Sequence, residues 1–514
     1  MDNIDFTSIK LKKIGETFAG EFYSGLANSF LELKPYSFSK DEKKLIDVLK
    51  KVIVGGTPFY EIDSIAGLPK DFSDSFRDKI TSVIELEDAF QKLPRKEVFQ
   101  KIVSDLSVLL QPVKFVSDKR ALAEEILHSA IGLKRLSFFY LDDDFEELMI
   151  NSLDSIFIFH KKYGMCRVNI TLGQKEFESI LDRIANSAGK KFNSKNPLID
   201  ARLPDGSRVN ATYSEVSPKG HSLTIRKFYP IPITMLDLIE HNVLSSEVAA
   251  FLWTMSDGFG VNPKNILIIG GTASGKTTFL NTLSNFIRLN ERVISIEDTL
   301  ELSLLGRSNW VQLEAKHSIE GEVTMDELLK NSLRMRPDRL VVGEVRGKEA
   351  MTLFSAMDNG HNGCLGTLHA NNAKEAIIKL QERPFLVPQV MLPLIDLVVV
   401  LQRNYSREKG IVRRVKQITE VTNMDRQVLL ANIFEYDQAL DLIKSTPTPS
   451  HLMEVFASEN SMTKNEVKTE IETRQLILEW MLDKGVRKPE EVLEVIQSYY
   501  YDPKKVLSMV YSKK

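Results

Sequence analysis

The most constraining feature of this sequence is a glycine-rich run that follows four consecutive apolar residues. Residues 266–269 read Ile-Leu-Ile-Ile, and residues 270–278 read Gly-Gly-Thr-Ala-Ser-Gly-Lys-Thr-Thr. The apolar run predicts a strand covered on both faces, and the glycine loop leads into a predicted helix. The pattern G-x-x-x-x-G-K-[ST] at such a junction predicts a P-loop, whose backbone N–H groups and helix N-terminus bind phosphates.

Two side chains of this loop carry predicted roles. Lys276 would reach the β- and γ-phosphates, and the Thr277 hydroxyl would ligate Mg²⁺. ATP and Mg²⁺ are therefore the expected cofactors, and the alternative is a glycine-rich turn that binds nothing. The predicted nucleotide-binding segment consists of Gly270, Gly271, Thr272, Ala273, Ser274, Gly275, Lys276, Thr277 and Thr278.

A second apolar run, 340–342, is followed by Gly343 and Glu344, which lies 68 positions after Lys276. Glu344 would fall just past the carboxyl end of a buried strand, where α/β sheets place their ligands. A carboxylate there can polarise the attacking water or hold it through the metal shell. We therefore interpret Glu344 as a catalytic residue that also contacts Mg²⁺ through water.

Two further predicted strands end in polar residues. Residues 293–296 lead into Glu297 and Asp298, which could orient Mg²⁺ or water, although Asp298 could instead cap a helix. Residues 363–368 lead into His369, where an imidazole could sense the γ-phosphate through a hydrogen bond. The alternative for His369 is a structural histidine, and His361 on the preceding turn is a weaker candidate of the same kind.

Arg208 and Arg226 lie in the segment that precedes the P-loop. An arginine presented by another domain or a neighbouring subunit commonly stabilises the phosphate that leaves. From the residues alone, both arginines could equally be surface residues.

Length and composition limit the classes of protein that remain. A chain of 514 residues is too long for one core, so two to four domains are expected. The net charge of −3 gives no global attraction to nucleic acid or to an anionic membrane. The two cysteines cannot supply a four-cysteine zinc site, and no N-terminal signal peptide or membrane-spanning stretch is expected. Any membrane contact is then peripheral.

The order of predicted elements divides the chain into three parts. Residues 1–115 predict a helical segment without recognisable chemistry, in which Ser39 caps a helix. Residues 116–232 predict a small α/β domain of short strands, with helices over 121–133 and 176–188. Residues 233–514 alternate strands with helices, the pattern of a parallel sheet, and end in helices.

The motifs together resemble those of the type II/type IV secretion ATPase superfamily. Segments 270–277, 297–301, 343–344 and 366–371 resemble its Walker A, Asp box, Walker B and His box, and 202–208 and 224–227 resemble its arginine-bearing strands. The resemblance implies an α/β fold, with a RecA-like P-loop NTPase domain at the C-terminus and a smaller PAS-like α/β domain before it. It also implies that Arg208 and Arg226 contact the phosphates and that Glu297, Asp298 and His369 assist catalysis.

Within the superfamily, the sequence most resembles the motor ATPase of the archaellum. That resemblance implies a homo-hexameric ring in the cytoplasm, bound peripherally to the membrane and acting on a polytopic membrane platform protein and other motor subunits. Residues 1–115 would then dock partners or lipid, and no nucleic acid is expected as a partner. An archaeal adhesion-pilus assembly ATPase and a DNA-conjugation or translocation ATPase are the alternatives, and an ATP-binding scaffold without turnover is a third.

Overall fold

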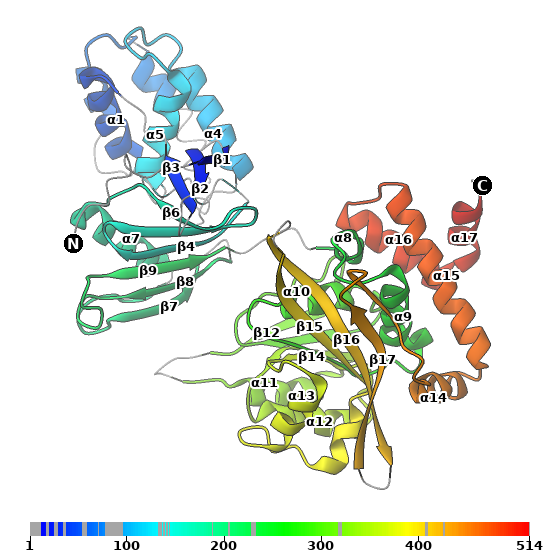
Figure 1. The fold of residues 1–514 in the computed structure, drawn as a ribbon. Helices are drawn as coiled ribbons and strands as arrows, with labels where there is room; N and C mark the ends of the chain where they lie inside the picture. The colour runs from blue at the N-terminus through cyan, green and yellow to red at the C-terminus, as the bar shows by residue number, and fades with distance from the viewer. Residues whose placement is uncertain are drawn as a thin grey trace. The chain divides into compact units, whose positions relative to one another are not determined.

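The computed structural model describes most of the chain, and the chain splits into two compact units, Met1–Phe228 and Tyr229–Lys514 (Figure 1). Each unit is built around its own nine-stranded sheet. The described residues are 12–16, 20–24, 29–33, 38–53, 59–69, 71–77, 96–131, 136, 139, 142, 144–187, 189–203, 206–227, 233–316, 321–406, 410–424 and 427–512.

The second unit contains the predicted P-loop in a sheet of order β12-β11-β13-β14-β10-β15-β16-β17-β18. The first six strands in this order run parallel, and the antiparallel strands follow from β15 onward. This confirms the predicted α/β class. The strands are β10 (Ile266–Gly270), β11 (Val293–Glu297), β12 (Trp310–Glu314), β13 (Arg339–Val345), β14 (Leu365–Leu368), β15 (Leu397–Ser406), β16 (Gly410–Met424), β17 (Gln427–Asp437) and β18 (Leu442–Ser445).

Helices cover both faces of this sheet, which explains why its central strands are apolar along their whole length. In β10, Ile266 and Ile268 enter one core, and Leu267 and Ile269 enter the other. The helices are α8 (Met235–Glu240), α9 (Ser246–Asp257), α10 (Lys276–Ser284), α11 (Met325–Ser332), α12 (Glu349–Asp358), α13 (Ala373–Gln381), α14 (His451–Glu459), α15 (Lys464–Asp483), α16 (Pro489–Tyr501) and α17 (Pro503–Tyr511).

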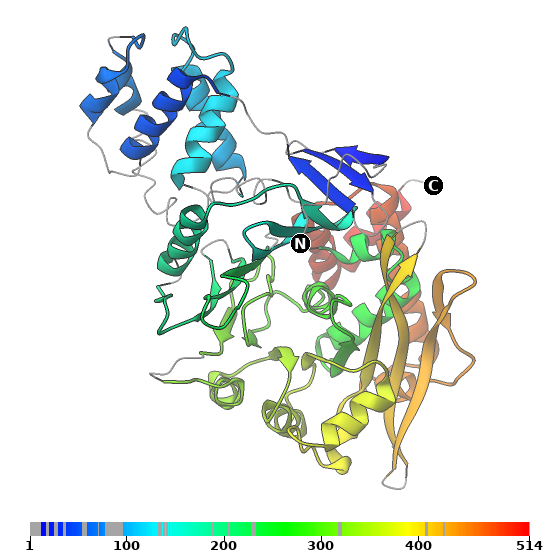
Figure 2. The same ribbon diagram turned by 60° about the vertical axis from the view of Figure 1, so that its left-hand side comes forward.

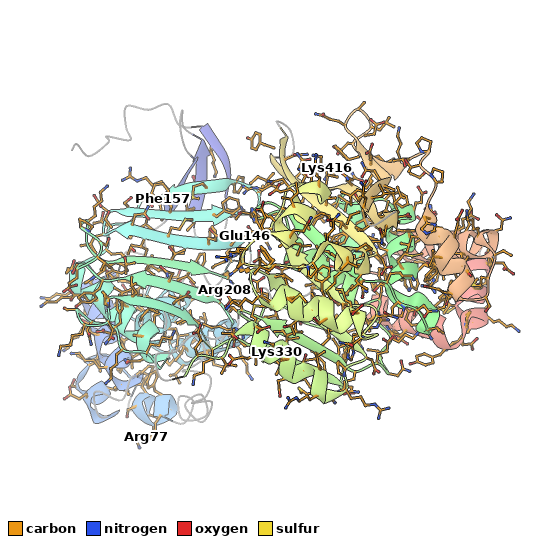
Figure 3. The ribbon with its side chains drawn as sticks, turned by 90° about the horizontal axis from the view of Figure 1, so that it is seen from below. Arg77, Glu146, Phe157, Arg208, Lys330 and Lys416 are labelled. Carbon is orange, nitrogen blue, oxygen red and sulfur yellow. The ribbon has the colours of Figure 1, made fainter. Side chains whose placement is uncertain are left out.

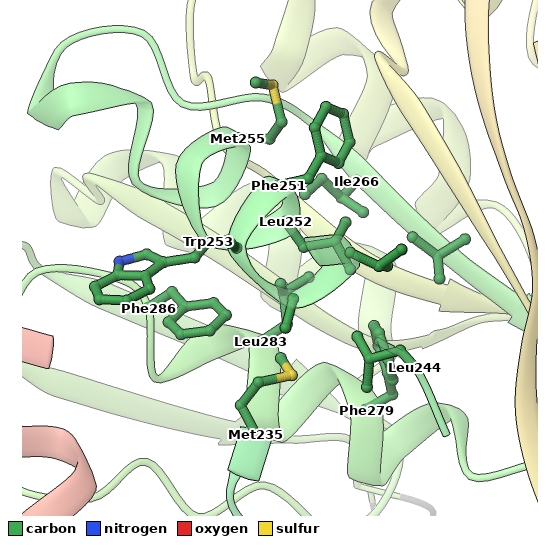
Figure 4. Packing of buried hydrophobic residues seen from close by; sticks show 14 of the residues in the cluster. Met235, Leu244, Phe251, Leu252, Trp253, Met255, Ile266, Phe279, Leu283 and Phe286 are labelled. Carbon is green, nitrogen blue, oxygen red and sulfur yellow. The ribbon is translucent and has the colours of Figure 1, made fainter. Parts of the chain in front are cut away.

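The larger of the two cores combines α9, α10, α15 and α16 with one face of the sheet, and α11, α12 and α13 pack on the other face. Figure 4 shows part of the larger core, where Trp253 of α9 stacks on Phe286 with ring centroids 5.3 Å apart. The helix that carries Lys276 is held in this core by Phe279, Leu280 and Leu283, all fully or almost fully buried. The start of α10 is thereby fixed against the sheet edge.

The first unit has a sheet of order β1-β2-β3-β6-β5-β4-β9-β8-β7 with α7 (Gln174–Ser187) packed into its core. Its pairs are antiparallel except β3–β6, which is parallel. The strands are β1 (Lys12–Glu16), β2 (Gly20–Ser24), β3 (Ser29–Leu33), β4 (Phe145–Ser152), β5 (Ser155–His160), β6 (Gly164–Val168), β7 (Leu198–Arg202), β8 (Arg208–Thr212) and β9 (Ser222–Arg226).

The prediction that residues 1–115 are helical is wrong at its start. Strands β1–β3 form there, and β3 pairs with β6, so this segment extends the sheet of the predicted α/β domain. Among the described residues of this segment, α1 (Lys40–Ile53) and α4 (Lys96–Leu109) are helices, and they share a separate core with α5 (Lys119–Ile131), which belongs to the segment predicted as the α/β domain.

Helix α1 begins as predicted, because Ser39 and Glu42 cap each other's backbone N–H groups. The boundary predicted near residue 232 falls outside the described residues. Among the helices of the described part of the chain, none is both long enough and apolar enough to cross a membrane.

Candidate nucleotide-binding site

The predicted glycine loop connects β10 to α10, as the sequence pattern requires. A Cβ at Gly270 would lie 2.4 Å from Ser274 Oγ and 2.6 Å from the Leu401 carbonyl, so only glycine fits this close turn. Gly275 has a φ of 91° and precedes the helix without a side-chain cap. The first N–H groups of α10 therefore face the loop, in the arrangement that binds phosphate.

Lys276 is the first residue of α10, and its ammonium points into the loop. It donates to the carbonyls of Gly270 at 3.1 Å and Gly271 at 3.2 Å. Burial lowers the pKa of Lys276, and the nearby Glu344 carboxylate opposes this shift. The cation is thus held at the mouth of the loop, where a phosphate would gain most from it, and Thr277 and Thr278 follow it half-buried in the first turn.

The predicted site residues of the second unit lie at one edge of the sheet because four parallel strands end there. The Cα partners Ile269–Leu368, Val345–Leu368 and Ile296–Val342 set β10, β14, β13 and β11 at matching heights. Gly270, Glu297, Glu344 and His369 therefore lie at or just past the carboxyl edge of the sheet. The hydroxyl of Thr367 donates to the Gly343 carbonyl at 2.6 Å and ties β14 to β13 beside Glu344.

Glu344 is paired with an arginine that the motifs did not single out. Arg346 Nη2 lies 2.7 Å from Glu344 Oε2, and Arg346 Nη1 lies 3.1 Å from Asp298 Oδ2. Burial would lower the pKa of Arg346, but the hydrogen bond and charge of Glu344, with the charge of Asp298, raise it. One guanidinium thus joins the ends of β13 and β11. The signal in the sequence that could have identified Arg346 is its position two residues after Glu344, the candidate catalytic carboxylate.

Glu297 is more deeply buried than Glu344. It is 1% exposed, and its Oε2 accepts hydrogen bonds from the backbone N–H groups of Glu301 at 2.7 Å and Leu302 at 3.0 Å. A Cβ on Gly343 would lie 3.0 Å from Glu297 Cγ, so the glycine before Glu344 makes room for this side chain. Glu297 shapes the loop after β11, which contains Asp298.

His369 directly follows β14 and is exposed, as a group that meets a ligand must be. Its carbonyl accepts a hydrogen bond from Lys379 at 2.8 Å, which fixes the backbone there. His361 precedes β14 and therefore lies at the opposite, amino edge of the parallel sheet. Its carbonyl accepts from the Cys364 thiol at 3.1 Å, and the topology separates it from the P-loop edge.

The two arginines expected from the preceding domain are cross-strand neighbours in the first unit. Arg208 begins β8 (Figure 3), and its Cα partner on β9 is Arg226. Arg202 on β7 lies opposite Arg208, and Glu147 on β4 lies opposite Arg226, with 3.7 Å between Arg226 Nε and Glu147 Oε1. A row of three arginines thus crosses three strands. Arg202 lies in the same segment, 202–208, as Arg208, but it was not among the predicted site residues.

The loop, the lysine at the helix start and the carboxylates at one sheet edge define a P-loop ATPase. A family model described as "Type II/IV secretion system protein" matches residues 139–478. The chain belongs to this family, whose members are ATPases, and it is itself an ATPase of the type II/IV secretion family.

Three relatives illustrate the similarity. Uncharacterized protein MJ0900 of Methanocaldococcus jannaschii is 30% identical over 489 residues, covering 93% of this chain and 82% of that protein. Uncharacterized protein MJ0781 of the same organism is 51% identical over 229 residues, which cover 44% of this chain and only 32% of that longer protein. A probable conjugal transfer protein, TrbB of Sinorhizobium fredii, is 31% identical over 289 residues, covering 54% of this chain and 84% of that protein.

Proposed function

We propose that residues 270–278 bind the phosphates of ATP and that Glu344 activates the water that attacks the γ-phosphate. Lys276 would neutralise the β- and γ-phosphates, and Thr277, with Glu344 through water, would hold Mg²⁺. The observation that carries the proposal is the shared edge, where the loop of Lys276 and the Glu344 carboxylate lie at the ends of neighbouring parallel strands. The oxygen ligands offered there suit Mg²⁺, which supplies charge neutralisation when bound.

The remaining predicted residues would assist this reaction. Asp298 lies within reach of the same arginine as Glu344, which supports a role in orienting water or the metal shell. Glu297 would act by shaping the loop that carries Asp298, and His369 would sense the γ-phosphate from the end of β14. Arg208 and Arg226 would reach the phosphates from the domain before the P-loop, and their adjacency on one sheet face supports a joint role.

We further propose that the protein is a hexameric motor that powers assembly, and with it rotation, of the archaellum. A nucleotide between two domains moves them only through its different affinity for their open and closed arrangements. ATP would close a PAS-like domain of residues 116–232 on a RecA-like domain of residues 233–514, and hydrolysis would release it. Successive closures around a ring at the cytoplasmic face of the membrane would act on a polytopic platform protein. The resemblance of the sequence motifs to those of the archaellum motor ATPase supports this branch.

Two alternatives stay within the same family. Assembly of an archaeal adhesion pilus needs the same motor without rotation. A role in DNA conjugation is favoured by the similarity to the conjugal transfer protein TrbB, although the net charge of −3 does not favour a nucleic-acid channel.

Deletion of the gene from its source organism distinguishes these functions. Loss of swimming and of archaella, restored by the wild-type gene and not by Lys276→Ala, is the expected result. Normal archaella with lost adhesion pili would favour the pilus ATPase. Stimulation of phosphate release by single-stranded DNA would favour the conjugation ATPase.

A further inference from the structure

The hairpin of β15 and β16 extends past the strand that leads into the P-loop. Strand β10 ends at Gly270, whose parallel partner on β15 is Leu401, yet β15 continues to Ser406 and β16 returns from Gly410. Figures 1 and 2 show these long strands running side by side in the second unit. Residues of the hairpin beyond Leu401 are therefore level with the glycine loop rather than with strand β10.

One of these residues, Arg413, contacts the loop directly. Its Nε donates to the Ala273 carbonyl at 3.1 Å, across 140 positions of sequence. Its Cδ lies 3.3 Å from the position that a Cβ on Gly275 would take, so the aliphatic stem covers that glycine. The side chain thus touches the loop at two places, both with left-handed backbone: φ is 57° at Ala273 and 91° at Gly275.

This contact sets the direction of a backbone N–H that faces the loop interior. In a trans peptide the carbonyl of Ala273 and the N–H of Ser274 point in opposite directions. Because Arg413 holds that carbonyl toward β16, the Ser274 N–H is turned inward, where its nitrogen donates to the Gly271 carbonyl at 3.4 Å. Backbone N–H groups directed inward are the groups with which a P-loop binds phosphate.

The loop needs such support because alanine does not favour this conformation. A left-handed φ at a residue with a Cβ is sterically unfavourable. A charged donor on the Ala273 carbonyl offsets that cost, since hydrogen bonds to charged groups are stronger than neutral ones. The Ser274 side chain is buried at 2% exposure, and its hydroxyl has no hydrogen-bond partner among the described residues, so this side chain does not hold the peptide between Ala273 and Ser274.

We infer that Arg413 is a positioning residue of the nucleotide site, which holds the P-loop in its phosphate-binding shape from the neighbouring hairpin. The inference rests on the proposed role of residues 270–278. It assigns to β16 a function in ATP binding that is separate from its place in the sheet. Arg413 acts through the loop backbone and needs no contact of its own with the nucleotide.

The test compares Arg413→Gln with Arg403→Gln. Arg403 is the exposed Cα partner of Arg413 on β15, so the control removes the same charge from the same hairpin. Binding of a fluorescent ATP analogue with Mg²⁺ is titrated for the full chain. Arg413→Gln should raise the Kd about three- to tenfold, less than the full effect of losing a charge-assisted hydrogen bond because Arg413 acts on the nucleotide only through the loop, and Arg403→Gln should leave it unchanged.

A second measurement separates positioning from general stability. Hydrogen exchange of the peptide covering residues 271–278 should speed up without nucleotide in Arg413→Gln and not in Arg403→Gln. Arg413→Lys, which keeps a cationic donor, should recover part of the affinity. Melting temperatures should agree among the variants, and a loss of binding that only follows a lowered melting temperature would overturn the inference.

The remaining outcomes are also decisive. Wild-type affinity in Arg413→Gln, or an equal loss in Arg403→Gln, overturns the positioning role. Lys276→Ala is included as a reference. If it binds like the wild type, the proposed nucleotide site itself fails, whereas loss in Lys276→Ala with full binding in Arg413→Gln overturns the inference alone.

Discussion

Arg346 holds Glu344 through two donors on one carboxylate oxygen, with Nη2 at 2.7 Å and Nε at 3.0 Å from Glu344 Oε2. A guanidinium bound in this way fixes the position of the carboxylate, because a fork of donors leaves it few alternative orientations. The same group reaches Asp298 on the neighbouring strand end. The carboxylates of Glu344 and Asp298 therefore share the guanidinium of Arg346 as their common cation.

Substitution of Arg346 by Gln should slow ATP hydrolysis by about ten- to a hundredfold, because loss of hydrogen bonds between charged groups costs about 1.5–3 kcal/mol. Affinity for ATP should change less than kcat, since Arg346 acts on Glu344. Phosphate release at saturating ATP measures the effect, and Arg346→Lys should recover part of it. Unchanged kcat in Arg346→Gln would contradict the positioning of Glu344 by this arginine.

Glu344→Gln should reduce turnover by about two to four orders of magnitude, the usual contribution of a general base. The variant keeps the size of the side chain, so ATP binding should persist. The matched control is Glu382→Gln, because Glu382 is an exposed glutamate of the same unit. This variant should hydrolyse ATP like the wild type. Wild-type turnover in Glu344→Gln would exclude this residue as the base.

Glu297→Ala should destabilise the second unit by about 2–4 kcal/mol, because it leaves the N–H groups of Glu301 and Leu302 without their acceptor. Glu297→Gln retains an amide oxygen and should cost less. Thermal unfolding with and without nucleotide measures both variants. If Glu297→Ala melts with the wild type while losing turnover, its role is chemical rather than structural.

Glu42 gives the first unit a defined sensitivity to acid. Burial would raise its pKa, but hydrogen bonds from Ser117 and Ser39 lower it from 4.5 to about 2. The unfolded chain therefore binds more protons between these values, so the stabilisation is present above pH 4.5 and is lost as pH falls toward 2.

Unfolding of the wild type and Glu42→Gln should then differ at pH 7 and converge as the pH is lowered through that interval. Asp41→Asn, an exposed neighbour in the same helical turn, serves as the control and should show no such dependence. A constant difference between wild type and Glu42→Gln from pH 7 to pH 3 would show that the carboxylate charge is not responsible.

The parts of the site that could be predicted are those encoded locally. Strand β10 is buried on both faces, so its apolar run stands out, and the loop that follows needs glycine at 270 and 275 for steric reasons. Polar residues after such runs, including Glu344 and His369, then fall at one edge because parallel strands end together. The apolar pattern of each strand and the position of the polar residue after it were therefore sufficient to predict these site residues.

What could not be predicted depends on contacts between distant segments. Arg413 reaches Ala273 only because β15 and β16 pair in a register that contains a bulge, which no local pattern specifies. Strand β3 was missed for a similar reason, since its parallel partner β6 lies more than 130 positions further along the chain. The pairing with β6, rather than the local antiparallel pairing with β2, joins β3 to the sheet of the α/β domain.

Nucleotide binding at the P-loop is tested most directly by calorimetric titration of the full chain with Mg²⁺ and a non-hydrolysable ATP analogue, for the wild type and Lys276→Ala. We expect one saturable site per chain in the wild type and no measurable binding in the variant, because the ammonium of Lys276 is the cation at the mouth of the loop. Equal affinity in the two proteins would contradict the claim that this loop holds the nucleotide.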